Sequence, residues 1–351
     1  AMLLTAALAL VTRLTPPDAR SRAIGLFLGL VAAVPALGPF LSGVLVDLLS
    51  WRWLFVVPLL LPVAALVISR TLVPETQCAE ERRPDLAGAV ALFVTLAAVS
   101  VGLILGPADP TDPLPLLAFA TAAVVGAAFV VIEGRVADPM LPLRFFRQRA
   151  FVGGNLVWML GALTSWGAVF FLAITLQATL GLRPFVAGLV LVPIYLVMMA
   201  ASPLAGRVAE RIGPRPPILV GLGLYSAGLW VLSSIGPTSP VVPDVLAGVG
   251  TMAVGMATFT APLLAVTMGS LDDADQGVAS GVNNAAGQLA GLLAVVVLPA
   301  IAGLTGVSLS DPAFAAGYAS ALRAAAVIAG VGIAVAAFTL GGTRSALRRP
   351  G

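Results

Sequence analysis

The sequence predicts an all-α membrane protein: a helical bundle of about ten complete transmembrane helices plus one partial N-terminal helix. Of its 351 residues, 59% are hydrophobic and only 10% are charged, whereas soluble domains carry roughly 25% charged residues. Its 27 Pro and 37 Gly would weaken soluble helices but are tolerated in transmembrane ones. A series of apolar stretches completes the argument, because each is long enough to cross a hydrocarbon layer about 30 Å thick.

Ten apolar stretches follow one another along the chain: Ala23–Leu48, Trp53–Ile68, Leu86–Gly106, Leu114–Ile132, Phe151–Leu176, Phe185–Ala205, Ile218–Ile235, Val241–Met268, Val282–Leu304 and Tyr318–Leu340. An eleventh, Ala1–Val11, is too short to cross and lacks the basic leader and cleavage site of a signal peptide. A helix that starts inside hydrocarbon leaves backbone donors unpaired. We therefore expect that upstream sequence is missing.

The basic residues are all arginine, because the chain contains neither Lys nor His. Without Lys there is no phosphate-loop ATPase and no Schiff base, and without His the usual general base and commonest metal ligand are absent. We expect no catalytic residues, no metal and no cofactor. The single Cys78 is interpreted as an incidental loop thiol. Abundant Ala, Leu, Val and Gly indicate a GC-rich bacterial source.

The arginines also predict orientation. Sixteen occupy alternate connections and the C-terminal tail, only Arg52 and Arg183 lie on the opposite side, and Arg323 lies within a span. The positive-inside rule places the sixteen in the cytoplasm, although the acidic 269–280 connection breaks the pattern. The sequence therefore predicts a bacterial plasma-membrane protein with a cytoplasmic C-terminus. Arginines spread over short loops favour a lipid partner and argue against nucleic acid.

Two connections are long and polar, 69–85 and 133–150. In the second, Leu141, Leu143, Phe145 and Phe146 alternate with Arg144, Arg147 and Arg149. Such alternation predicts a short amphipathic segment on the inner membrane surface.

Two motifs carry functional information. The first, in the first complete span, holds Gly29, Gly38, Pro39 and Gly43; small residues at this spacing let helix backbones approach closely, and proline loosens a helix locally. Tight packing alone is the simpler interpretation. This run resembles the antiporter motif of the major facilitator superfamily, although Val34 and Ser42 replace small residues or Gly of the family pattern.

The second motif, which we call the latch motif, occupies a predicted cytoplasmic loop and contains Gly206, Glu210, Arg211, Gly213 and Arg215. It resembles the loop signature of the same superfamily, where it acts as a charge-relay latch between neighbouring helices. Because an acid flanked by arginines can pair differently in two states, the motif can bias a conformational balance. The alternative is that the charges of this motif only fix the orientation of the chain in the membrane.

The resemblance covers nearly the whole chain and is similar to the fourteen-helix drug:proton antiporter branch. It implies the following divisions: 1–68, the end of an N-terminal six-helix half; 69–85, a cytoplasmic loop; 86–132, an inserted helix pair; 133–150, a cytoplasmic amphipathic linker; 151–340, a C-terminal six-helix half; 341–351, a cytoplasmic tail. In the family an Arg commonly precedes the Gln of the penultimate helix, but here Gly287 precedes Gln288, which questions any Arg-dependent role at that place.

Transporters of this kind hold substrate near the membrane midplane. Uncharged polar and aromatic side chains are the candidates for lining such a cavity: Asn155, Trp158, Trp166, Gln177, Tyr195, Asn283, Asn284 and Gln288. Hydrogen bonding between helices is the alternative for each Asn and Gln. No acid lies near a helix centre, and the resemblance implies that a proton-coupling carboxylate belongs to the missing N-terminal helices.

The leading hypothesis is a secondary active transporter, a proton-coupled exporter of hydrophobic or cationic drug-like molecules. The partners are then membrane lipid, a small-molecule substrate and protons. Export of an endogenous metabolite or a self-made antibiotic by the same fold is a second hypothesis. A fragment inactive without its missing helices and an integral membrane enzyme are the remaining ones.

Overall fold

The computed structural model describes residues 38, 40–72, 85–106, 112–136, 139–236, 239–272, 275–304 and 313–340, and these ranges contain helices and no strand. Nine helices in them are long and apolar enough to cross a membrane, which confirms nine of the predicted spans. The other predicted span is seen only at its end, as helical residues 38 and 40–48. The Ala1–Val11 stretch lies outside the described residues.

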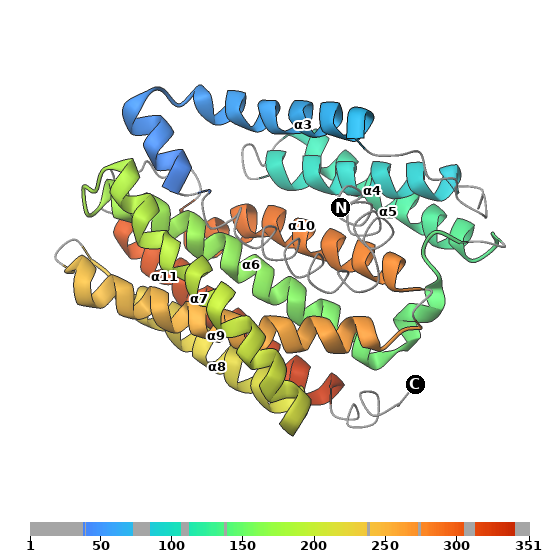
Figure 1. Cartoon of the computed structure of the whole chain (residues 1–351). Coiled ribbons are helices and arrows are strands. Elements are labelled where there is room, and N and C mark those ends of the chain that lie inside the picture. The colour runs from blue at the N-terminus through green and yellow to red at the C-terminus, as the bar shows by residue number, and fades with distance from the viewer. Residues whose placement is uncertain are drawn as a thin grey trace.

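The helices follow one another as α3 (Trp53–Leu72), α4 (Leu86–Leu105), α5 (Pro113–Glu133), α6 (Arg149–Ala178), α7 (Pro184–Ile212), α8 (Arg215–Leu232), α9 (Leu246–Gly269), α10 (Gln276–Ile301) and α11 (Ala313–Thr339). A short 3₁₀-helix, η1 (Leu143–Arg147), precedes α6, and a π-helical turn, η2 (Val241–Val245), opens α9. The bundle in Figure 1 has α6 to α11 packed together, with α3, α4 and α5 along one side.

The α4–α5 pair forms an antiparallel unit with well-defined helix starts. The Asp85 side chain accepts a hydrogen bond from the Gly88 N–H at 2.8 Å, and Asp112 accepts one from the Leu114 N–H at 2.9 Å. Such caps satisfy donors that would otherwise lack a partner at a helix start. Besides each other, the helices of this pair have α10 as their neighbour, through α4. The α4–α5 pair therefore contacts the bundle of α6 to α11 mainly through α4.

The core lies among α6 to α11, where α8 and α9 pack most closely. A Cβ added at Gly221 would lie 2.6 Å from the Phe259 backbone nitrogen, and one at Gly255 would collide with the Tyr225 backbone. Such contacts bring two helix backbones together without intervening side chains. The Tyr225 hydroxyl, fully buried here, donates a hydrogen bond to Thr164 Oγ1 at 3.1 Å, so this polar group is satisfied inside the bundle.

Two helix boundaries differ most from the sequence prediction. Helix α7 continues beyond Ala205 to Ile212, and α10 begins at Gln276 rather than Val282. The α7 extension adds charged residues and the α10 extension adds small and polar ones, because hydropathy stops at the edge of the apolar layer whereas helical hydrogen bonding does not. The latch motif is consequently formed by helix ends, with only Gly213 and Pro214 between α7 and α8.

The linker before α6 docks onto protein at one of its two phenylalanines. Phe145 is 1% exposed and packs with Phe151, Leu271 and Ala279, whereas Phe146 is 49% exposed. The neighbouring Arg144 guanidinium contacts the Asp275 carboxylate at 2.7 Å. Phe145 therefore faces the protein rather than the membrane surface, and η1 ties the linker to the start of α10.

We predict that Gly255→Ala lowers the free energy of unfolding by about 1–3 kcal/mol, because the added methyl forces the α8 and α9 backbones apart. Gly250→Ala on the same helix is the matched control, since a Cβ there meets no atom within 4 Å. Thermal unfolding of the purified protein measures both changes. Equal melting temperatures for the two variants would contradict the close α8–α9 contact.

Candidate functional site

The end of the antiporter motif packs against the start of α7. A Cβ added at Gly43 would lie 2.7 Å from both Phe185 Cα and the Pro184 carbonyl oxygen, and the Phe40 and Phe185 rings lie 5.4 Å apart. Gly38 has nothing within 4 Å of its added Cβ. Gly29 and Pro39 lie outside the described residues. Of the two motif residues that the structure describes, Gly43 is thus the one at which two backbones meet.

Asp47, one helical turn beyond Gly43, continues this contact with polar groups. Its Oδ2 accepts a hydrogen bond from the Phe185 N–H at 3.2 Å and lies 3.6 Å from Arg183 Nη2. The Asp47 side chain is 11% exposed and that of Arg183 is 74% exposed, so the carboxylate is shielded while the guanidinium meets solvent. Exposed ion pairs contribute about 0–1 kcal/mol. The hydrogen bond from the Phe185 backbone also orients the Asp47 carboxylate toward the start of α7.

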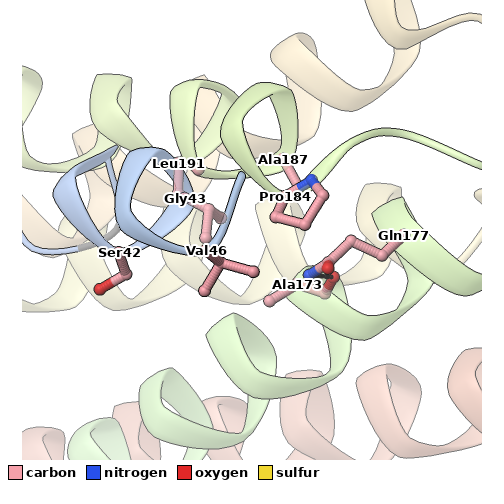
Figure 2. A pocket seen from close by; sticks show the side chains of 9 residues that line it. Ser42, Gly43, Val46, Ala173, Gln177, Pro184, Ala187 and Leu191 are labelled. Carbon is pink, nitrogen blue, oxygen red and sulfur yellow. Dashed lines mark hydrogen bonds between the residues drawn. The ribbon is translucent and has the colours of Figure 1, made fainter. Parts of the chain in front are cut away.

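A cleft of about 230 Å³ opens beside this contact (Figure 2). Its lining comes from three helical segments: Ser42, Gly43 and Val46 from residues 40–48, Ala173 and Gln177 from α6, and Pro184, Ala187, Gly188 and Leu191 from α7. Drug-sized ligands occupy pockets of about 300–1,000 Å³, so this cleft is smaller than such a site. It marks the seam between the segment before α3 and the C-terminal half.

Sequence reasoning did not select Arg183, Phe185 or Ser42 as residues of a site at this seam. One signal was available: Arg183 is one of only two arginines on the side predicted to be external, and Asp47 lies at the same predicted side. The partner of Gly43 had no such signal. Its contact joins residues about 140 positions apart, and helical periodicity describes only neighbours within a helix.

A second polar group joins α6 to α10. The Asn283 side-chain amide donates to Asn155 Oδ1 at 3.2 Å, and the Trp158 indole N–H donates to the Asn283 carbonyl at 3.1 Å. A Cβ at Gly287 would lie 3.0 Å from the Trp158 indole nitrogen. The glycine that replaces the family's usual Arg therefore accommodates an aromatic ring from the facing helix.

The other candidates for the cavity are dispersed. Gln177 lies in the cleft and donates to the Ala173 carbonyl at 3.0 Å, and Tyr195 packs against the core of the C-terminal half. Trp166 is 58% exposed beside Gly291, and Asn284 and Gln288 are exposed on α10. The structure brings Asn155, Trp158 and Asn283 together, but it does not gather all eight residues around one cavity.

The latch motif lies at the adjoining ends of α7 and α8. Gly213 has a φ of 91°, in the left-handed region that favours glycine, and it turns the chain between the two helices. The Arg215 guanidinium donates to the Ala337 carbonyl at 2.9 Å, near the C-terminal end of α11, where positive charge is favoured. Gly206, Glu210 and Arg211 belong to the last turns of α7, and the two charged side chains are exposed. Within the described ranges Arg215 thus contacts α11 rather than Glu210.

Long apolar helices with internal polar bonds and charged ends define a multi-pass membrane protein. The chain belongs to the Major Facilitator Superfamily, whose family model matches residues 1–295 and 155–350. This confirms the predicted family and helical bundle.

Curated relatives share this similarity over most of the chain. It is 32% identical over 309 residues to the Tetracenomycin C resistance and export protein of Streptomyces glaucescens, covering 85% of this chain and 56% of that protein. It is 33% identical over 298 residues to the Multidrug resistance protein Stp of Mycobacterium tuberculosis, covering 84% and 55%. With the Lincomycin resistance protein of Streptomyces lincolnensis it shares 32% over 268 residues, covering 76% and 55%. The chain spans about half the length of these relatives.

We predict that Gly43→Ala opens the seam, because its methyl group must displace the α7 backbone at a cost of about 1–3 kcal/mol. The readout is the rate at which an impermeant maleimide, added outside cells, labels Ser42→Cys in a Cys78→Ser background. About 1 kcal/mol corresponds to roughly a fivefold rise in labelling.

Gly38→Ala is the control, since its methyl group enters open space, and it should leave the labelling rate unchanged. An equal rise in both variants would contradict a specific role for Gly43. Labelling only from the cytoplasmic side would contradict the predicted orientation.

Proposed function

We propose that the full-length protein is a secondary active exporter of hydrophobic or cationic drug-like compounds in a bacterial plasma membrane, driven by inward proton movement. The contact of Gly43 with the start of α7 carries the proposal. It closes a seam between the segment preceding α3 and the C-terminal half at one end of the bundle. Alternating access requires such a seam to close on one side of the membrane and open on the other.

The orientation follows from the arginines. Arginines gather in the sequence before α4, between α5 and α6 and at the adjoining ends of α7 and α8, so we assign these helix ends, with the C-terminus, to the cytoplasm. The Gly43 seam then lies at the external end. To Glu210 and Arg211, which are exposed at the end of α7 that we assign to the cytoplasm, we assign an exchange of partners when the carrier changes state.

Substrate and coupling are separate parts of the proposal. In the described ranges the acidic residues lie at helix ends or in connections, so we assign coupling to a carboxylate outside them. The printed names of the relatives, which include multidrug resistance and antibiotic export, support a drug-like cargo. We assign no catalytic residue.

A self-made antibiotic is the second candidate cargo. It is favoured by the Streptomyces relatives named for tetracenomycin C and lincomycin resistance. An antibiotic biosynthetic cluster beside the gene would support this cargo, and its absence would favour foreign compounds.

The test is expression of the full-length gene in an efflux-deficient bacterial host. We expect lower steady-state accumulation of a hydrophobic cationic dye than in the empty-vector strain, because export opposes passive entry. A protonophore should abolish the difference, since it removes the driving force. The Gly43→Ala variant, expressed to the same level, should export less than Gly38→Ala. Unchanged accumulation over a panel of dyes and antibiotics would refute drug export, and export insensitive to the protonophore would refute proton coupling.

A further inference from the structure

The linker between α5 and α6 is held to two helices that are far apart in the sequence. Near its beginning, the buried Glu133 carboxylate at the end of α5 accepts a hydrogen bond from the Leu141 N–H at 3.1 Å. On η1, Arg144 Nη2 lies 2.7 Å from Oδ2 of Asp275, the residue that precedes α10. The linker therefore ties the end of α5 to the start of α10.

Phe145 adds an apolar contact to this attachment by filling a pocket. The pocket is made by Phe151 from the first turn of α6, Leu271 from the α9–α10 connection and Ala279 from the first turn of α10. The Phe145 and Phe151 rings meet edge to face, with centroids 5.7 Å apart. This cluster is separate from the main core of α6 to α11, so the packing at this end of α10 depends on the linker.

Outside this cluster, the start of α10 is packed more loosely than its middle. The helix packs chiefly on α6 and has few contacts with α9 and α11. Its first two turns include Gly277 and Gly281, both exposed, where an added Cβ would meet no atom within 4 Å. Further along, a Cβ at Gly287 would lie 3.0 Å from the Trp158 indole nitrogen. The start of α10 therefore has room to move, and Phe145 fills the space between it and α6.

The Phe145 pocket lies one helical turn from the polar group that joins α6 to α10. Asn155 follows Phe151 by four residues and donates to its carbonyl at 2.9 Å, and Asn283 follows Ala279 by four. Asn283 donates in turn to Asn155 Oδ1 at 3.2 Å. Because residues four apart lie on the same face of a helix, the Phe145 pocket covers this polar group from the end of the bundle.

The two contacts of η1 differ in strength. The Arg144 side chain is 68% exposed, and such an ion pair is weak because water competes for both charges. Phe145 is 1% exposed, so its docking removes an aromatic ring from water. Phe145 therefore determines how tightly η1 docks, while Arg144 determines where on α10 it docks.

We propose that η1 is a strap that closes the α6–α10 contact at the end assigned to the cytoplasm, and that Phe145 leaves its pocket when this end opens. This rests on the proposed function, because an exporter must open at this end to take up its cargo. Undocking of Phe145 separates the start of α10 from α6 and uncovers Asn155 and Asn283 to a drug-like compound from the cytoplasm. The Glu133 hydrogen bond keeps the strap attached to α5 until it docks again.

The first experiment measures docking in the resting full-length protein. Ala279→Cys, at a position buried in the pocket, is the reporter in a Cys78→Ser background, and inside-out vesicles present it to a maleimide from the cytoplasmic side. Phe145→Ala should raise the labelling rate of this residue by roughly tenfold or more, because truncation of a buried phenylalanine empties the pocket. Phe146→Ala is the matched control, since Phe146 is 49% exposed, and it should leave the rate unchanged. Equal rates in the two variants would overturn the proposal.

The second experiment measures undocking during transport. With Phe145 intact, labelling of Ala279→Cys should rise several-fold when the vesicles accumulate a cationic dye under a proton gradient. The reason is that turnover populates an open state that is minor, about 0.1–10%, at rest. A protonophore should return the rate to its resting value. An unchanged rate in vesicles that accumulate the dye would overturn the strap and leave the exporter proposal standing.

A crosslink provides an independent test of the same movement. Arg144→Cys and Asp275→Cys, at positions whose side chains meet in the docked state, are joined by a short reducible crosslinker. The locked protein should lose dye transport, and a reductant should restore it, whereas each single-cysteine variant should transport with or without the crosslinker. Full transport by the locked protein would overturn the strap. Absence of dye transport in the wild type would refute the exporter proposal instead, and the comparison of Phe145→Ala with Phe146→Ala would still decide whether η1 docks.

Discussion

Close approach of helix backbones at glycine positions is the contact on which this bundle depends. Lipid tails are as apolar as leucine side chains, so burying leucine against a neighbouring helix gains little. Attraction comes instead from dense packing and from hydrogen bonds inside the protein. Gly221 and Gly255 bring α8 and α9 together, and Gly43 brings an earlier segment onto α7.

The helices could be predicted from the sequence because their signal is local. Crossing hydrocarbon requires an apolar run, and nine such runs in the described ranges are helices. Helix ends were less predictable. The sequence from Gly206 to Ile212 is charged, which suggested a loop, yet it continues α7 until Gly213 turns the chain. Charge marks where the membrane ends, whereas only Gly213 marks where the helix ends.

The site could be predicted only in part. Spacing identified Gly43 and Arg215 as residues to examine, but not Phe185 or the Ala337 carbonyl as their partners, because those contacts join distant segments. The candidate cavity shows the same limit. Residue type selected eight candidates for the cavity. Asn155, Trp158 and Asn283 lie together, whereas the fold disperses the others.

The docking of Phe145 has a consequence for how the protein is made. Arg144 and its partner Asp275 are 131 residues apart, and the pocket for Phe145 includes Leu271 and Ala279. At about 5–20 residues per second, a ribosome needs roughly 7–26 s to synthesise the intervening chain. Throughout that interval a phenylalanine destined for the interior has no pocket, while α6 to α9 are already entering the bilayer. The linker therefore packs late in folding, because it can dock only after α10 has been synthesised and inserted.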